Sequence, residues 1–148
     1  MNDLKKQIAD HTASIMKEVI TLNNEKEEIV KQHEKEMDSV FCEFITVIDT
    51  FDRSEQIIKE KNYDKVDEAN KSIKRLLNAK KKALAVLEKF SVEPIIFPDN
   101  QIIDDYCMTV ATEPDSNRKN GEIISIEKTG YLRKGRVIRL AEVVIVKN

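Results

Sequence analysis

The sequence predicts an α+β protein with a long N-terminal helix and a small C-terminal β-sheet domain. Helix breakers carry most of this prediction, because no Gly or Pro precedes Pro94 and all six lie between Pro94 and Gly135. Pro removes a backbone donor and Gly is costly inside a helix, so the first stretch can form long helices. The spacing of apolar residues changes at the same point. We therefore expect a helical domain over residues 1–90 and a β domain over residues 91–148.

Apolar residues in the first helix recur every eleven positions. One such series is Ile8, Val19, Val30 and Phe41. This repeat gives about 3.67 residues per turn, so two paired helices would remain nearly straight. A seven-residue repeat fits less well, because its second core position holds His11 and two glutamates. A stripe this narrow needs a partner, and we expect a parallel homodimer. The expected dimer interface consists of Ile8, Ile15, Val19, Leu22, Val30, Met37, Phe41, Phe44 and Ile48.

A second helix should pack against the end of the first. The first helix is expected to end near Glu60, and Asp64 is a candidate N-cap for the second. Residues three, four and seven apart form the apolar stripe of the second helix, which is Val66, Ala69, Ile73, Leu76, Ala83, Leu87 and Phe90. We place Lys80–Lys82 on its solvated face. Two antiparallel helices per chain, doubled by dimerisation, predict a four-helix bundle.

The C-terminal segment has the pattern of short strands separated by turns. Strands are expected over residues 106–111 and 122–128, a hairpin over 130–135, and one strand or a pair over 136–146. The glycines mark strand ends. About 55 residues make a small domain that should depend on the helical bundle for stability.

The composition argues against several classes of protein. With 25 Lys and Arg against 27 Asp and Glu, the net charge of −2 predicts no nucleic-acid partner. No apolar run approaches the ~18 residues that a membrane span needs. The beginning of the chain shows periodic charge rather than an apolar signal core, so we expect a cytoplasmic protein.

Nothing in the sequence indicates catalysis, a cofactor or a metal. No Gly-rich phosphate loop, nucleophile elbow or metal-ligand spacing occurs. Cys42 and Cys107 lie far apart and have no His near them in sequence, so we interpret both as packed residues rather than nucleophiles. We expect a protein that is not an enzyme.

Three segments resemble the GrpE family, the nucleotide exchange factors of DnaK-type heat-shock chaperones. Gly121–Ile124, Thr129–Tyr131 and Gly135–Arg139, followed by an apolar ending, match the family's C-terminal signature. Val47–Arg53 is similar to its Val-x-Asp-x-(Leu/Phe)-(Asp/Glu)-Arg motif, and Lys89–Val92 matches more loosely. The likeness extends over most of the chain.

The resemblance implies a co-chaperone that binds the ATPase domain of a DnaK-type chaperone and accelerates ADP release. In the family, the Arg directly after the hairpin Gly belongs to the surface that meets the chaperone, which makes Arg136 the first candidate here. The full set of expected contact residues is Arg136, Tyr131, Gly130, Gly135, Arg139, Glu127, Lys128 and Ile145.

One departure from the family pattern leaves an alternative open. The long helix of the family usually carries an Asn followed by a basic cluster, about 28 residues before the bundle motif. That register here is Thr21–Glu25, which contains no basic residue. The alternative is a non-enzymatic dimeric coiled-coil scaffold that has lost chaperone binding.

Overall fold

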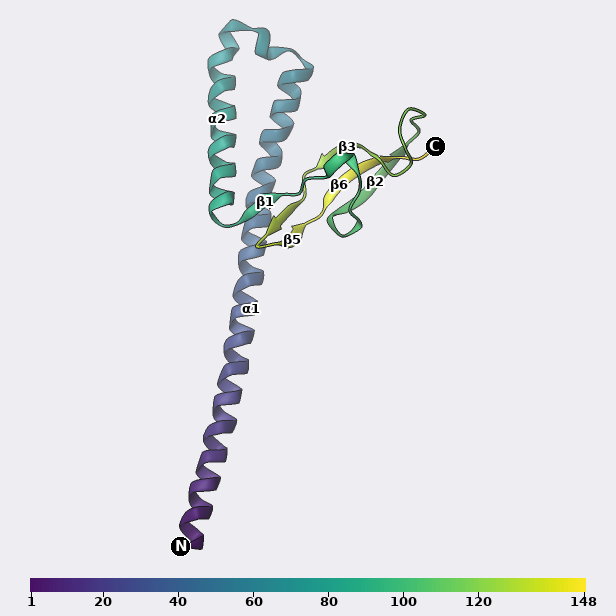
Figure 1. The fold of residues 1–148 in the computed structure, drawn as a ribbon. Helices are drawn as coiled ribbons and strands as arrows, with labels where there is room; N and C mark the ends of the chain where they lie inside the picture. The colour runs from purple at the N-terminus through teal and green to yellow at the C-terminus, as the bar shows by residue number, and fades with distance from the viewer. The chain divides into compact units, whose positions relative to one another are not determined.

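The computed structural model describes residues 1–148, which form two long helices followed by six short strands (Figure 1). The helices are α1 (Asn2–Glu60) and α2 (Asp67–Lys89), and the strands are β1 (Val92–Pro94), β2 (Cys107–Glu113), β3 (Ile123–Lys128), β4 (Tyr131–Arg133), β5 (Arg136–Arg139) and β6 (Ala141–Val146). Three single-turn 3₁₀ helices occupy Tyr63–Lys65, Pro98–Asn100 and Asp104–Tyr106. The change from helix to strand falls at the predicted position, and the α+β class is confirmed.

The chain divides into two compact units, residues 1–39 and residues 40–148. The first unit consists only of the beginning of α1, and its apolar stripe faces solvent. The stripe residues Ile8, Ile15, Val19, Leu22 and Val30 are each between 48% and 58% exposed. No helix of the chain combines the length and the apolar character that crossing a membrane requires.

In the second unit, the end of α1 and α2 lie side by side as an antiparallel hairpin (Figure 1). Ile45, Ile48 and Leu87 are almost completely buried in its core. The rings of Phe41 and Phe90 lie 5.3 Å apart between their centroids. Phe41 and Ile48 were expected at a dimer interface, but the chain's own packing covers them.

The ends of the two helices differ in how well the sequence located them. The end of α1 at Glu60 was predicted correctly. The predicted N-cap of α2 was wrong: Asp64 lies in the 3₁₀ turn, and the N-cap is Val66, which offers no side-chain acceptor. Instead, Asp67 and Glu68 place negative charge in the first turn of α2, where it interacts favourably with the helix dipole.

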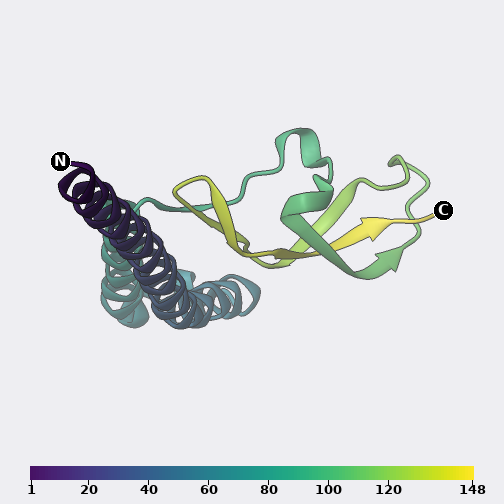
Figure 2. The same cartoon turned by 90° about the horizontal axis from the view of Figure 1, so that it is seen from below.

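The strands form two three-stranded sheets. The first has the order β1-β4-β5 and is antiparallel throughout, while the second has the order β2-β6-β3, with β2 parallel and β3 antiparallel to β6. In Figures 1 and 2, the first sheet lies beside the helices and the second continues away from them to the C-terminus. The predicted last strand is therefore a pair, because β5 and β6 belong to different sheets.

The β module has its own core. Ile95, Phe97, Ile123, Ala141 and Val143 form its buried cluster. The second sheet and the connection between β1 and β2 supply this cluster. β6 contributes two members because it is the central strand. The first sheet thus stands between this core and the helical hairpin.

A charged triad joins the two helices of the hairpin. Lys80 was expected on the solvated face of α2, but it points toward α1, where its Nζ lies 2.8 Å from Asp52 Oδ1 and also pairs with Glu55. The hydrogen bond from Lys80, followed by one from Lys59, lowers the pKa of Glu55. Burial acts to lower the pKa of Lys80, but its bonds to Asp52 and Glu55 outweigh burial and the pKa is raised. The neighbouring Lys81 and Lys82 are exposed, as predicted.

We predict that Lys80→Met lowers the free energy of unfolding at pH 7 by about 1–2 kcal/mol, since it leaves Asp52 without its partner and Glu55 with Lys59 alone. A carboxyl whose pKa falls on folding stabilises the protein above its unfolded pKa, and the benefit is lost as the pH drops through the lower folded value. The difference between wild type and variant should therefore shrink below about pH 4.5. Thermal melts followed by circular dichroism at fixed protein concentration measure it. Lys81→Met is the control, and an equal loss in both variants would contradict the assignment.

Candidate functional site

The candidate partner surface is built on the β4–β5 hairpin. Its turn consists of Lys134 and Gly135, which both have positive φ values, 52° and 76°. Two successive left-handed residues match the twist of a two-residue hairpin, and Gly adopts this conformation without steric cost. A side chain at Gly135 would meet open space. Arg136 begins β5 directly after this turn and is exposed, so the turn presents it at the end of the hairpin.

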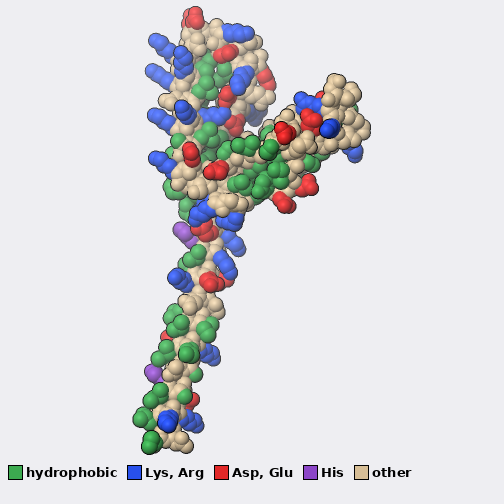
Figure 3. All heavy atoms as spheres, in the orientation of Figure 1, with side chains coloured by type: hydrophobic (Ala, Val, Ile, Leu, Met, Phe, Trp, Pro, Cys, Tyr) green, Lys and Arg blue, Asp and Glu red, His purple; other side chains and the backbone are tan.

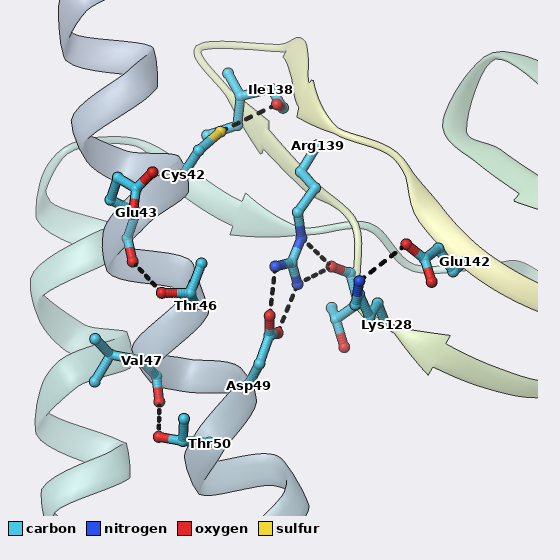
Figure 4. Close-up of polar contacts among 11 residues, drawn as sticks. Cys42, Glu43, Thr46, Val47, Asp49, Thr50, Lys128, Ile138, Arg139 and Glu142 are labelled. Atoms are coloured by element: carbon cyan, nitrogen blue, oxygen red, sulfur yellow. Dashed lines mark hydrogen bonds and ion pairs between the residues drawn. The ribbon is translucent and has the colours of Figure 1, made fainter.

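The other end of β5 is fixed to α1 by Arg139 (Figure 4). Its guanidinium makes two parallel bonds to Asp49, with Nη1 2.7 Å from Oδ2 and Nη2 2.7 Å from Oδ1. Nε and Nη2 also donate to the carbonyl oxygen of Thr129. Burial acts to lower the pKa of Arg139, but the bond and charge of Asp49 outweigh it and the pKa is raised. This fork geometry is specific to Arg, because the ammonium group of Lys cannot reproduce it.

Two further predicted contact residues are buried beside this ion pair. Tyr131 is only 2% exposed and its ring lies under Arg139, 5.5 Å from ring centroid to guanidinium carbon. Burial raises the pKa of the Tyr131 hydroxyl. Gly130 is buried too, and a Cβ there would lie 2.5 Å from the backbone nitrogen of Ala141 and 2.7 Å from Ile95. Gly130, Tyr131 and Arg139 therefore have roles inside the fold rather than on an exposed surface.

The remaining predicted contact residues lie on the second sheet. Glu127 is exposed and accepts a hydrogen bond from Ser125, and Lys128 pairs across strands with Glu142, with Nζ 3.1 Å from Oε1. Ile145 is half-buried against the β core. A role in partner binding stays a prediction for all of them. β3 ends at Lys128, and the next residue, Thr129, accepts the hydrogen bonds from Arg139.

Both cysteines pack as the sequence analysis expected. The Cys42 thiol donates to the carbonyl oxygen of Ile138 at 3.2 Å, and the Cys107 thiol donates to that of Ile103 at 3.4 Å. Burial raises the pKa of Cys107, which lowers its thiolate fraction at neutral pH. The chain contains no group of three or more His, Cys, Asp or Glu residues arranged to hold a metal ion.

Sequence reasoning missed Asp49 as the partner of Arg139. Both residues stand in recognised motifs, but 90 positions separate them and no local periodicity connects them. A signal was present in the sequence, since each is a charge among apolar neighbours: Ile48 precedes Asp49, while Ile138 and Leu140 flank Arg139. Two opposite charges in apolar contexts indicate a pair, because an unpaired half-buried charge is costly.

We predict that Arg139→Lys lowers the free energy of unfolding by about 2 kcal/mol, because one ammonium group replaces a fork that binds Asp49 and Thr129 together. Asp49→Asn should have a similar effect. Urea unfolding followed by circular dichroism, at one protein concentration, gives both values. Lys128→Met removes the more exposed pair with Glu142 and should cost less than about 1 kcal/mol. If Arg139→Lys cost no more than this control, the ion pair would not hold β5 to α1.

Two comparisons with known proteins identify the family. Residues 1–147 match the family described as GrpE. "Protein GrpE" of Fusobacterium nucleatum subsp. nucleatum is 26% identical to this chain over 153 residues, an alignment that covers 97% of this chain and 71% of the relative. The match spans the long helix, the helical hairpin and both sheets. The chain belongs to the GrpE family, a family of co-chaperones.

Proposed function

We propose that this protein is a cytoplasmic nucleotide exchange factor that binds the ATPase domain of a DnaK-type chaperone and accelerates ADP release. The observation that carries the proposal is the family match over residues 1–147. The geometry is compatible with it, because the hairpin that carries Arg136 is anchored at its other end through Arg139 and Asp49. An anchored hairpin can transmit force to a partner without yielding itself.

The proposed mechanism is differential binding to two states of the chaperone. The β module binds the nucleotide-binding domain when its cleft is open, so ADP leaves and ATP can enter. To convert a 1:99 open-to-closed ratio into 99:1, the module must bind the open state more tightly by about 5.5 kcal/mol. Arg136 supplies charge and hydrogen-bond donors at the exposed end of the hairpin. Glu127 and Lys128 extend the proposed surface along β3.

We further propose that the chain acts as a parallel homodimer through the first part of α1. The stripe from Ile8 to Val30 is about half exposed, and one helix cannot bury it alone. Met37 and Phe44 are half-buried and continue the stripe toward the helical hairpin. In this dimer, the α1–α2 helical hairpins of the two chains would together form the four-helix bundle.

We predict that Arg136→Ala reduces the acceleration of ADP release about tenfold at a fixed subsaturating concentration, because it removes a charged contact from the interface. Stopped-flow release of a fluorescent ADP analogue from a DnaK-type chaperone measures this, with Lys147→Ala as the control because it removes an exposed cation elsewhere on the β module. Equal helicity of both variants confirms that each is folded.

Two results would contradict parts of this proposal. If Arg136→Ala and the control accelerate release equally, Arg136 does not belong to the contact surface. If the folded wild-type protein does not accelerate release at all, the exchange function is wrong. The result would then favour the scaffold alternative, which the absence of a basic residue in Thr21–Glu25 keeps open.

For the dimer, we predict that Val19→Glu combined with Leu22→Glu shifts the protein to monomer, since both changes place charge in the apolar stripe of the proposed dimer interface. Met16→Glu combined with Ile20→Glu is the matched control: both residues are 62% exposed on the same helix but lie outside the eleven-residue stripe. Sedimentation equilibrium distinguishes the two states. If the control pair dissociated the dimer and the test pair did not, the proposed position of the dimer interface on α1 would be wrong.

A further inference from the structure

The exposed side of α2 carries a concentrated positive charge. No acidic residue occurs between Glu68 and Glu88. Six cations lie within about a third of the helix circumference and along ~27 Å of its length. We call them the basic face: Lys71, Lys74, Arg75, Lys81, Lys82 and Lys89. Figure 3 shows Lys and Arg side chains stacked along this side of the helical hairpin.

No residue of the basic face is neutralised within the chain. All six are exposed, and none makes a salt bridge. Three carboxylates of α1 in the helical hairpin have other partners, because Asp52 and Glu55 bind Lys80 and Asp49 binds Arg139. Lys80, on the inner side of α2, therefore pairs with Asp52 and Glu55 of α1. The six cations of the basic face remain available to bind a partner.

An apolar groove adjoins the basic face at Lys81. It has a volume of about 480 Å³ and lies between the end of α2 and β1. Its aliphatic walls include Leu84 of α2, Val92 and Pro94 of β1, and Ile96, which is 75% exposed. Glu88 and Glu93 also line it, so the groove itself favours an uncharged side chain, and carboxylates of a ligand would lie along α2 instead. An exposed isoleucine beside a groove is available for a partner's apolar side chain. Lys81 belongs to both features, so one ligand can contact both at once.

We propose that the basic face and this groove together bind an acidic protein segment, with one of its apolar side chains in the groove and its carboxylates along α2. Charge complementarity selects an acidic ligand. The groove favours a peptide over a nucleic acid, because its walls are aliphatic and Tyr131, its one ring, is too buried to stack on a base. A second copy of the same face does not fit, since like charges would meet. The proposal stands independently of nucleotide exchange.

The test uses fluorescence anisotropy with a fluorescein-labelled 18-residue peptide of Glu and Asp that carries two Leu residues near one end. We expect Lys74→Glu combined with Lys82→Glu to weaken binding at least about tenfold, and 300 mM salt to weaken it as well. The matched control is Lys5→Glu combined with Lys26→Glu, which changes the net charge equally within residues 1–39. It should bind almost as tightly as wild type.

The groove is tested separately. Ile96→Ser, at an exposed position, and a peptide in which Ser replaces both Leu residues should each weaken binding about threefold to tenfold. Each of the following results would overturn the proposal: no binding at 100 μM protein, equal loss in the two charge-reversed variants, no effect of removing the Leu residues, or tighter binding of an 18-nucleotide single-stranded DNA than of the peptide. The last result would assign the basic face to nucleic acid.

Discussion

The two bonds between Arg139 and Asp49 hold the two kinds of structure in this protein together. Asp49 lies in the part of α1 that packs on α2, and Arg139 ends the strand that leads into β6. Each bond is 2.7 Å long, and the same guanidinium also holds Thr129 at the start of the hairpin. One side chain therefore fixes the open end of the β4–β5 hairpin, where Thr129 precedes β4 and Arg139 ends β5, relative to the helix. The hydrogen bond from Cys42 to Ile138 and the stacking of Arg133 on the Phe41 ring, 5.2 Å from guanidinium carbon to ring centroid, add further contacts between this sheet and α1.

Within the β4–β5 hairpin, residues with a structural role lie only a few positions from exposed residues. Gly130, Tyr131 and Arg139 are buried or half-buried where the hairpin meets α1, whereas Gly135 and Arg136 are exposed at its turn. Because β5 is only four residues long, Arg136 lies about 10 Å from Arg139. Rigidity at one end and exposure at the other are the properties that a surface needs to hold a partner in one state. The proposed exchange function uses both.

Local patterns predicted the elements well, and contacts between distant segments were the part they could not predict. The absence of Gly and Pro before Pro94 located the helices, and the apolar runs between turn residues after it located β2 to β6, whereas β1 was not predicted. The N-cap of α2 was misplaced, because a 3₁₀ turn occupies Asp64 and the helix begins without a side-chain cap. The site residues came from family resemblance, which does not separate a conserved structural role from a contact role. The fold shows that Tyr131 is buried.

The distribution of charge over the folded surface could also be predicted only in part from the sequence. Counted along the chain, the signs are balanced and interspersed, which predicts an ordinary solvated surface. In the fold, Lys80 turns inward to Asp52 and Glu55, and the remaining cations of α2 face outward without partners. The asymmetry arises because helix geometry sorts neighbours such as Lys80 and Lys81 onto different sides.

The most direct test of the exchange function is thermodynamic. If this protein favours the open chaperone by weakening ADP binding, ADP must weaken the binding of this protein by the same factor. Calorimetric titration of the nucleotide-free chaperone and of the chaperone saturated with ADP measures that factor. The account predicts markedly lower affinity in ADP, matched by an equal loss of ADP affinity when this protein is saturating. Equal affinity with and without ADP would contradict it.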